Sequence, residues 1–232
     1  MEELWFFRGC MSTFREREIA EATLEILRRL RLPFRLFGRE LCCGSVLFRT
    51  GQERVAEEVR RRNGEEFRRL GVRRLLTACP GCYSAFRGDY SLDGVEVLHL
   101  TQLLRELIRE GRLRLRGRRV RATYHDSCHL GREWGIYEEP REVLRSIPDL
   151  ELVEMNLSRE FSRCCGAGGG VRSAFREVSR AASKTRVGDA LEAGAELLVT
   201  SCPFCYHHLK EAAEGRMEVR DLSLLVRDLM EG

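Results

Sequence analysis

The chain has 232 residues, of which 43% are hydrophobic and 33% charged, and its formal net charge is +4. This balance of 40 basic and 36 acidic residues is typical of a globular protein and gives no reason to expect nucleic acid as a partner. No stretch approaches the ~18 consecutive apolar residues of a membrane helix, and the opening MEELWFFRGC does not resemble a signal peptide. We therefore expect a cytoplasmic protein with no direct membrane span.

Short apolar runs alternate with segments of helical periodicity along the chain. In the first half, strands are predicted over residues 4–10, 33–38, 72–79 and 95–100, and helices over 15–30, 51–71 and 101–111. In the second half, strands are predicted over residues 119–128, 150–156 and 195–202, a helix over about 171–193, and a strand and helix at the end. This alternation is typical of an α/β fold with parallel sheets.

The ten cysteines form two sets of five that follow the same pattern. Each set reads Cys, then Cys-Cys-Gly, then Cys-Pro-x-Cys; the first set is Cys10, Cys42, Cys43, Cys79 and Cys82, and the second is Cys128, Cys164, Cys165, Cys202 and Cys205. The segment LLTACPGCY (75–83) is also mirrored by LVTSCPFCY (198–206). An internal duplication of this kind predicts two tandem repeated βα domains related by pseudo-symmetry.

The boundary between the repeats is predicted near Gly117, which gives one cysteine-rich domain over residues 1–116 and a second over 117–232. The densest basic stretch of the chain, GRLRLRGRR (111–119), lies at this boundary. It carries no nucleic-acid-binding motif or interleaved aromatic residues, so we interpret it as a solvated linker.

Four cysteines, namely Cys10, Cys79, Cys128 and Cys202, each end a predicted strand. Ligands of open parallel sheets bind at the carboxyl ends of the strands, where helix N-termini offer free N–H groups and positive dipole ends. This position favours an anionic centre that is ligated by thiolates.

Three kinds of thiol chemistry compete for these sets. Adjacent Cys42 and Cys43 have Cα atoms ~3.8 Å apart, which is shorter than the roughly 4.4–6.8 Å of a relaxed disulfide. Disulfides also fit poorly in a cytoplasmic chain. Tetrahedral zinc would use four cysteines of each set and leave one over, whereas an iron–sulfur cluster can use all five. Zinc and iron–sulfur both stay open on spacing alone.

The motifs ELCCGS…TACPGC and YHDSCHLGRE…SRCCGAGGGVRS…TSCPFC resemble the duplicated cysteine-rich (CCG) domain of heterodisulfide reductase, as found in its B-type and D-type subunits. The resemblance covers essentially the whole chain. It implies that each set binds a noncubane [4Fe-4S] cluster, which gives two clusters per chain. It further implies an oxidoreductase that works within a complex and reduces a disulfide of small thiol coenzymes at these clusters.

Two other functions stay open. The same pair of domains occurs in electron-transfer subunits of glycerol-3-phosphate and lactate dehydrogenase complexes, and a zinc-stabilised scaffold is the third possibility. The chain has no Cys-x2-Cys-x2-Cys-x3-Cys run and no recognisable flavin motif. We therefore expect a ferredoxin-like iron–sulfur subunit as partner, with a flavoprotein subunit as a further candidate. The arginines of residues 112–119 are candidates for docking an acidic partner.

His129 follows Cys128 directly, and His207 and His208 follow Cys205 closely. Histidine titrates near neutral pH, so His129 is a candidate catalytic residue that supplies a proton to a leaving thiolate. The alternative is that these histidines are hydrogen-bonded residues at helix starts. His99, which stands where the second half has Asp221, is interpreted as structural.

The run CCGAGGG includes Gly166, Gly168, Gly169 and Gly170 and is neither a P-loop nor a dinucleotide fingerprint. It predicts a tight turn whose N–H groups point at sulfur, and Gly44 is predicted to do the same in the first half. Arg132 is a weaker candidate for binding an acidic substrate.

Overall fold

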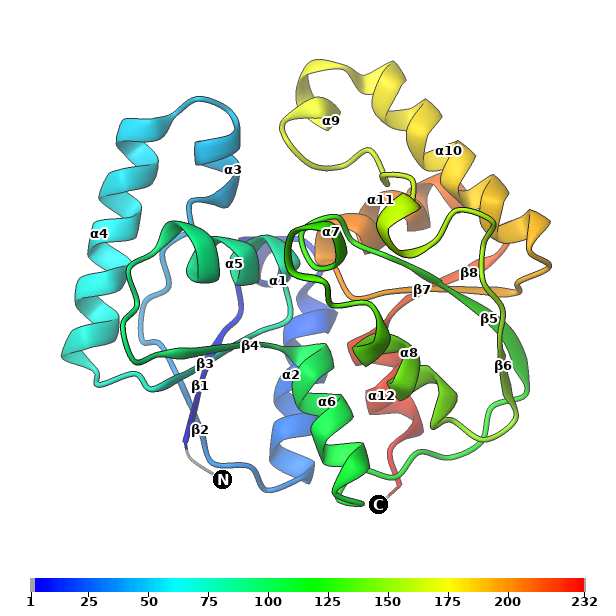
Figure 1. Ribbon diagram of the computed structural model, residues 1–232, viewed down its shortest axis with the longest axis horizontal. Coiled ribbons are helices and arrows are strands. Elements are labelled where there is room, and N and C mark those ends of the chain that lie inside the picture. Colours follow the sequence, from blue (N-terminus) through cyan, green and yellow to red (C-terminus); the bar gives the residue numbers. More distant parts are fainter. Residues whose placement is uncertain (1–2, 232) are drawn as a thin grey trace.

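The computed structural model describes residues 3–231 and contains two four-stranded sheets, one in each half (Figure 1). All neighbouring strands are parallel, in the orders β2-β1-β3-β4 and β6-β5-β7-β8. The strands are β1 Leu4–Phe7, β2 Phe34–Leu36, β3 Arg74–Thr77, β4 Glu96–His99, β5 Val120–His125, β6 Leu150–Leu152, β7 Leu197–Thr200 and β8 Glu218–Asp221. The predicted α/β fold with parallel sheets is confirmed.

Helices connect these strands in the same order in both halves. The first half has α1 Cys10–Phe14, α2 Arg17–Arg29, α3 Ser45–Arg49, α4 Glu53–Arg69, α5 Pro80–Ser84, the π-helical turn η1 Ala85–Asp89 and α6 Leu100–Arg109. The second half has α7 Gly131–Trp134, α8 Glu138–Arg145, the 3₁₀ turn η2 Arg159–Phe161, α9 Val171–Ala174, α10 Arg176–Glu192, α11 Pro203–Ala213 and α12 Leu222–Leu229. None of the helices within residues 3–231 is long and apolar enough to cross a membrane.

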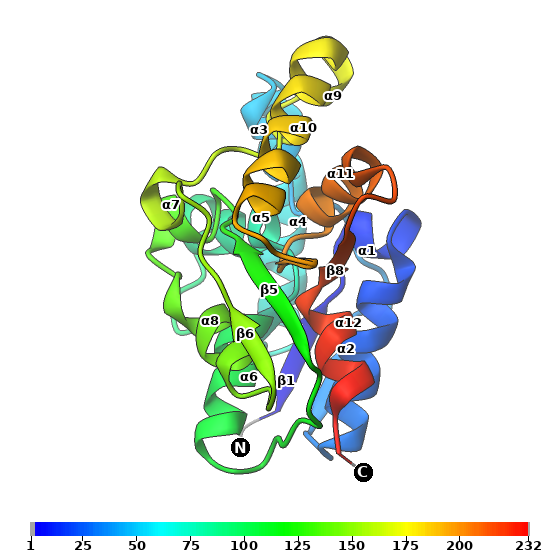
Figure 2. The same ribbon diagram turned by 90° about the vertical axis from the view of Figure 1, so that its right-hand side faces the viewer.

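The larger of the two hydrophobic clusters in the described residues is shared by the two halves. Helix α2 packs on α12, and α6 packs on α8 (Figures 1 and 2). Helices α2 and α8 are equivalent in the two repeats, as are α6 and α12, so the pseudo-symmetry relates one contact to the other. Fully buried side chains from both halves meet in this layer, among them Ile26, Leu104, Leu144 and Leu225. The predicted division at residues 116 and 117 thus falls in a segment that joins two units with a common core.

The helix predicted over residues 171–193 is interrupted. Phe175 has φ −135° and ψ 65°, which is not helical, and it separates α9 from α10. The first half is interrupted at the matching place, between α3 and α4. No Gly or Pro marks the break at Phe175, so the periodicity of the sequence gave no sign of it.

The arginine-rich segment after α6 is a linker that lies along the amino-terminal edges of the sheets. Leu113 and Leu115 are buried, Leu115 forms an antiparallel bridge with Met230, and the N–H of Arg116 donates to the carbonyl of Leu229. The cysteines that follow strands lie at the opposite, carboxyl edges. A partner that docks on the arginines of residues 112–119 would therefore lie at the edge opposite the cysteines, and the linker interpretation is favoured.

His99 and Asp221 begin equivalent helices and are both buried. The Nδ1 atom of His99 accepts from the N–H of Thr101 at 3.3 Å, and Oδ1 of Asp221 accepts from the N–H of Ser223 at 2.9 Å. The structural interpretation of His99 is confirmed. Both residues line the same small depression, which has no room for a water molecule. Burial lowers the pKa of His99 to about 3 and raises the pKa of Asp221 to about 7.

We expect Asp221→Asn to stabilise the protein at pH 8 and to change its stability little at pH 4. The pKa of Asp221 is raised in the folded state, so its contribution to stability is fully present below the unfolded pKa of ~3.9 and is lost as the pH rises through about 7. Asparagine keeps the acceptor that caps α12 and cannot ionise. Denaturant unfolding between pH 4 and 8 should show that the variant exceeds the unchanged protein in free energy of unfolding by a difference that grows to a few kcal/mol as the pH rises. A difference in free energy of unfolding that does not vary with pH would contradict this.

Candidate metal centre

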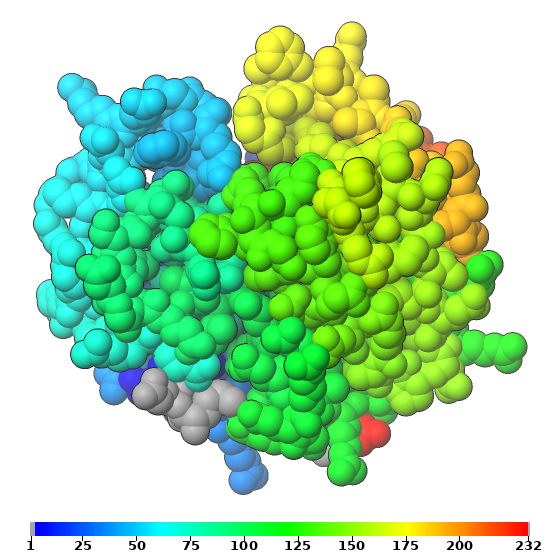
Figure 3. Space-filling model, viewed as in Figure 1, coloured from blue at the N-terminus to red at the C-terminus, as the bar shows by residue number. Residues whose placement is uncertain are grey.

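All ten cysteines line a single cavity of about 60 Å³ between the two halves. The cavity lies at the carboxyl edges of both sheets, and its lining includes Val46 and Arg49 of α3 together with Gly168 and Gly169, which precede α9. Figure 3 shows a notch between the blue surface around α3 and the yellow surface around α9. The sequence predicted one site in each half, and the structure shows that the two sites face the same space.

In each half, the first and fourth cysteines of the set follow the first and third strands along the chain. Cys10 begins α1 just after β1, and Cys79 is the N-cap of α5 just after β3. Strands β1 and β3 are neighbours at the point where the strand order reverses, which is the usual binding position in such sheets. Cys128 after β5 and Cys202 after β7 repeat this arrangement. The prediction that these four cysteines follow strands is confirmed.

The five thiols of each set form a continuous series of neighbours that shift one another's pKa values. In the first half it runs from Cys10 to Cys42, Cys43, Cys82 and Cys79 in that order, and in the second from Cys128 to Cys164, Cys165, Cys205 and Cys202. The Sγ atoms of Cys165 and Cys205 are 3.2 Å apart, well beyond the ~2.05 Å of a disulfide. All ten cysteines are free thiols. Each half therefore gathers five sulfur ligands.

Crowding of the thiols separates their pKa values. Hydrogen bonds from Cys10 and Cys43 lower the pKa of Cys42 to about 2, while hydrogen bonds to Cys43 and Cys79, together with burial, raise the pKa of Cys82. The same alternation holds in the second half, where hydrogen bonds from Cys128 and Cys165 lower the pKa of Cys164. Like charges this close cannot all ionise unless a cation lies among them. The donor set therefore fits a metal centre with thiolate ligands.

Backbone N–H groups point at the same sulfurs. The N–H of Gly44 lies 3.4 Å from Sγ of Cys42, and that of Gly166 lies 3.3 Å from Sγ of Cys164. Both glycines have positive φ, and a Cβ on Gly166 would lie 2.6 Å from the carbonyl oxygen of Ser179. The predicted glycine turns that aim N–H groups at sulfur are confirmed for these two residues.

The structure adds a histidine that the sequence analysis did not single out. A ring nitrogen of His125 and the Sγ atoms of Cys165 and Cys205 all lie within 4.8 Å of one another. His125 is the last residue of β5, is buried, and accepts a hydrogen bond from the buried Arg186. The signal available in the sequence was a difference between the repeats, because the equivalent strand end in the first half is Phe7.

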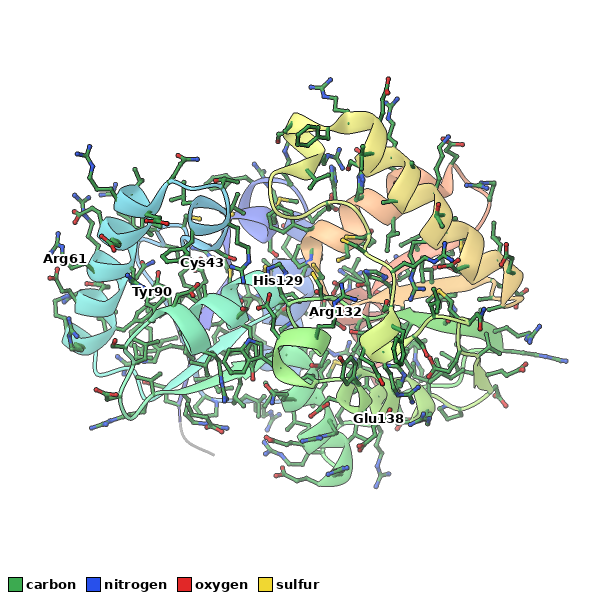
Figure 4. The ribbon with its side chains drawn as sticks, turned by 45° about the horizontal axis from the view of Figure 1, so that its top comes forward. Cys43, Arg61, Tyr90, His129, Arg132 and Glu138 are labelled. Atoms are coloured by element: carbon green, nitrogen blue, oxygen red, sulfur yellow. The ribbon has the colours of Figure 1, made fainter. Side chains whose placement is uncertain are left out.

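His129 lines the cavity, in keeping with its predicted role. Its Nδ1 atom lies 3.3 Å from Sγ of Cys128, and Nε2 lies 3.7 Å from a carboxylate oxygen of Glu133 (Figure 4). Burial lowers its pKa. The side chain is therefore placed to exchange a proton with a group in the cavity, and its catalytic role stays a prediction.

His207, His208 and Arg132 do not line this cavity, although they were considered with it. His207 lies 2.5 Å from the Glu16 carboxylate of the other half, and Nε2 of His208 lies 2.8 Å from Oγ of Ser179. Arg132 donates to the carbonyl of Ser162 at 2.6 Å. These contacts give the three side chains structural partners, which favours the alternative interpretation for the two histidines.

Comparison with known proteins identifies relatives along nearly the whole chain. The D subunit of dihydromethanophenazine:CoB--CoM heterodisulfide reductase from Methanosarcina barkeri is 39% identical over 98% of this chain and 59% of its own length. The B subunit of fumarate reductase (CoM/CoB) from Methanothermobacter marburgensis is 34% identical over 95% of this chain and 44% of its own length. EtfAB:quinone oxidoreductase from Syntrophomonas wolfei is 32% identical over 99% of this chain and 34% of its own length.

The chain thus spans only about a third to three fifths of the length of these relatives. Among solved structures, Picrophilus torridus aspartate racemase aligns over 96% of this chain and 90% of its own length. The TM-score is only 0.45 and the sequence identity 8%. The family described as the cysteine-rich domain (CCG) matches residues 4–87 and 122–210. The chain therefore belongs to the cysteine-rich (CCG) domain family and contains that domain twice.

Proposed function

We propose that each five-cysteine set binds a noncubane [4Fe-4S] cluster and that the chain is the iron–sulfur subunit of an oxidoreductase that reduces a disulfide of small thiol coenzymes. The observation that carries this proposal is that both cysteine sets line one cavity. A substrate held there can contact both sites at once. The relationship to a heterodisulfide reductase supports the choice of a disulfide.

The number of converging thiols favours iron–sulfur over zinc. A structural zinc site is four-coordinate, so one thiol in each set would have no ligand role. Iron–sulfur clusters are held by cysteine thiolates, and N–H groups such as those of Gly44 and Gly166 donate to sulfur at 3.3–3.4 Å. Ten free thiols also fit a reducing compartment, so the proposal includes a cytoplasmic location.

Reduction of a disulfide takes two electrons and two protons and yields two thiols. Bound clusters supply the one-electron chemistry, and the chain supplies the surroundings. Met11, Val46 and Phe204 contribute apolar side chains to the cavity lining. His129 lies at the same cavity beside Cys128 and is the proposed proton donor to a released thiolate.

An electron-transfer subunit is the second candidate function. The relative EtfAB:quinone oxidoreductase is 32% identical over nearly the whole chain, and its name mentions no disulfide. In that case the two sites would pass electrons between partners, as in a dehydrogenase complex. Under either function we propose a ferredoxin-like iron–sulfur subunit, or a flavoprotein, as the electron donor. Two of the relatives are named as subunits, which supports the existence of partners.

We expect anaerobically purified protein to contain about eight iron atoms and as many acid-labile sulfides per chain, with little zinc, because each [4Fe-4S] cluster accounts for four of each. Metal analysis and a sulfide assay on the same sample measure this. About two zinc ions without labile sulfide would instead support the zinc scaffold.

We expect Cys42→Ser to lower the iron content by about half and to leave the second-half cluster intact, and Cys164→Ser to do the reverse. The reason is that the thiols that shift one another's pKa values lie within one half. Iron content and electron paramagnetic resonance (EPR) spectra of both variants check this, and circular dichroism checks the fold. If either variant loses both clusters while folded, the ligands are shared between the halves.

We expect the cluster-loaded protein to reduce a small-molecule disulfide with a reduced viologen dye, consuming two dye electrons per disulfide. Loss of either cluster should lower this rate by about tenfold or more, because a substrate in the shared cavity contacts both sites. The two single-cluster variants above serve as matched comparisons. A loaded, redox-active protein that reduces no disulfide would favour the electron-transfer function.

A further inference from the structure

The two cysteine sets have the same ligands but different surroundings. Strands β1 and β5 end at Phe7 and His125, which pair with the equivalent threonines Thr77 and Thr200 of their neighbouring strands. Helices α4 and α10 both have 17 residues, and the eleventh is Asn63 in one and Arg186 in the other. Two neutral residues of the first half are thus replaced by a histidine and an arginine in the second.

Arg186 is a fully buried cation. Its side chain has no exposed surface, and its Nε atom donates to Nδ1 of His125 at 3.1 Å. The two terminal nitrogens donate to the carbonyl of Leu157 at 2.8 Å and to Oγ of Ser162 at 2.9 Å. Guanidinium stays protonated in proteins. A positive charge is therefore fixed one hydrogen bond away from His125.

The hydrogen bond from Arg186 decides the tautomer of His125. Because a guanidinium can only donate, Nδ1 of His125 must accept and cannot carry a proton. The ring is therefore the neutral tautomer with its proton on Nε2. A ring nitrogen of His125 lies within 4.8 Å of the Sγ atoms of Cys165 and Cys205, which places the ring beside those sulfurs.

The first half has no charged residue at the two equivalent positions, which are Phe7 and Asn63. Phe7 packs against Phe86 with ring centroids 4.8 Å apart, in the apolar cluster that also contains Cys79 and Cys82. Asn63 donates to the carbonyl of Cys42 at 2.9 Å and to the hydroxyl of Tyr90, and both side chains are uncharged. These contacts hold the Cys-Cys backbone without placing a cation behind it.

Carboxylates only partly offset the cation of the second half. Asp189 lies 3.2 Å from Nη1 of Arg186, while Nε of the same group faces His125, so the positive side of the pair is turned toward the cysteines. Arg163 also lies 3.6 Å from Asp189. In the first half, the position of Ser162 is held by Glu40, whose carboxylate accepts from the backbone N–H groups of Arg8 and Gly9 and pairs with the Arg8 guanidinium at 2.9 Å. The guanidinium groups of Arg8 and the cavity-lining Arg49 are partly exposed and paired with carboxylates, whereas the cation of the second half is fully buried.

We propose that Arg186, acting through His125, makes the second-half cluster the more easily reduced of the two, so that the first electron entering the chain is held there. The inference rests on the proposed function only in requiring iron–sulfur clusters. One-electron reduction adds one negative charge and breaks no bond. A nearby buried cation stabilises the reduced state, and the ring of His125 contacts this cation and lies within 4.8 Å of the cysteine sulfurs. His125 and Arg186 are thus positioning residues that set a reduction potential.

The experiment is an anaerobic redox titration of the loaded chain followed by EPR, in which the Cys42→Ser and Cys164→Ser variants assign each signal to a half. We expect the second-half cluster to have the higher potential. His125→Phe and Arg186→Asn introduce the residues that the first half has at these positions. Each should lower the second-half potential so that the ratio of reduced to oxidised cluster falls at least tenfold at a fixed potential, which is ~59 mV for one electron.

The first-half potential in the same samples is the internal control for folding and should not change. Arg180→Gln, an exposed arginine on the same helix α10, is the matched control for loss of a charge and should shift neither potential. Because Arg186 acts through His125, the double variant should shift less than the sum of the single variants. Arg186→Lys keeps the charge and should recover part of the potential.

The inference is overturned if the two clusters have equal potentials, if the first-half cluster has the higher one, or if neither His125→Phe nor Arg186→Asn shifts the second-half potential. If Arg186→Asn does not fold, His125→Phe decides, since Phe7 occupies the same position in the first half. A chain without iron would contradict the proposed cofactor instead. Failure of disulfide reduction in a chain with unequal clusters would contradict only the proposed substrate.

Discussion

The packing of helices from one half against helices of the other half is the constraint on which the rest of the structure depends. Helices α2 and α6 of the first half bury their apolar faces against α12 and α8 of the second, so neither half has a complete core without the other. This packing fixes the orientation of the two sheets and turns their carboxyl edges toward a common space. The ten cysteines line one cavity because the core is shared, and no contact between the two sets is needed to bring them together.

The duplication preserved the five cysteines of each half and changed the residues that surround them. The order of neighbouring thiols is the same in both halves, and so are the N–H groups of Gly44 and Gly166. The residues one layer farther from the cavity differ, as Phe7 and Asn63 do from His125 and Arg186. Ligand identity decides which cofactor fits, while the outer layer tunes its electronic properties. Two copies of one motif can therefore hold equivalent cofactors at unequal potentials.

Much of the fold could be predicted from the sequence because two signals in it are local. Apolar runs marked the strands, and the duplicated motifs placed the cysteines at their carboxyl ends, as the structure confirms. The break at Phe175 could not be predicted, since neither Gly nor Pro marks it. The shared cavity depends on how two halves pack, which periodicity within one half does not encode. His125 lies within the YHDSCHLGRE motif but was missed because it becomes meaningful only through its contacts with Arg186, Cys165 and Cys205.

Burial of Arg186 would be costly if the charge served packing alone, because removing a guanidinium from water needs several compensating hydrogen bonds. The first half shows that the same position accepts the neutral Asn63 while the fold stays the same. Packing therefore does not require the cation, and a role toward the cysteines accounts for its retention better. The same reasoning separates His125, which has a ring nitrogen within 4.8 Å of the Sγ atoms of Cys165 and Cys205, from His208, whose ring contacts Arg172 and Ser179. Histidines near the cysteine motifs thus differ in whether their rings lie beside the sulfurs.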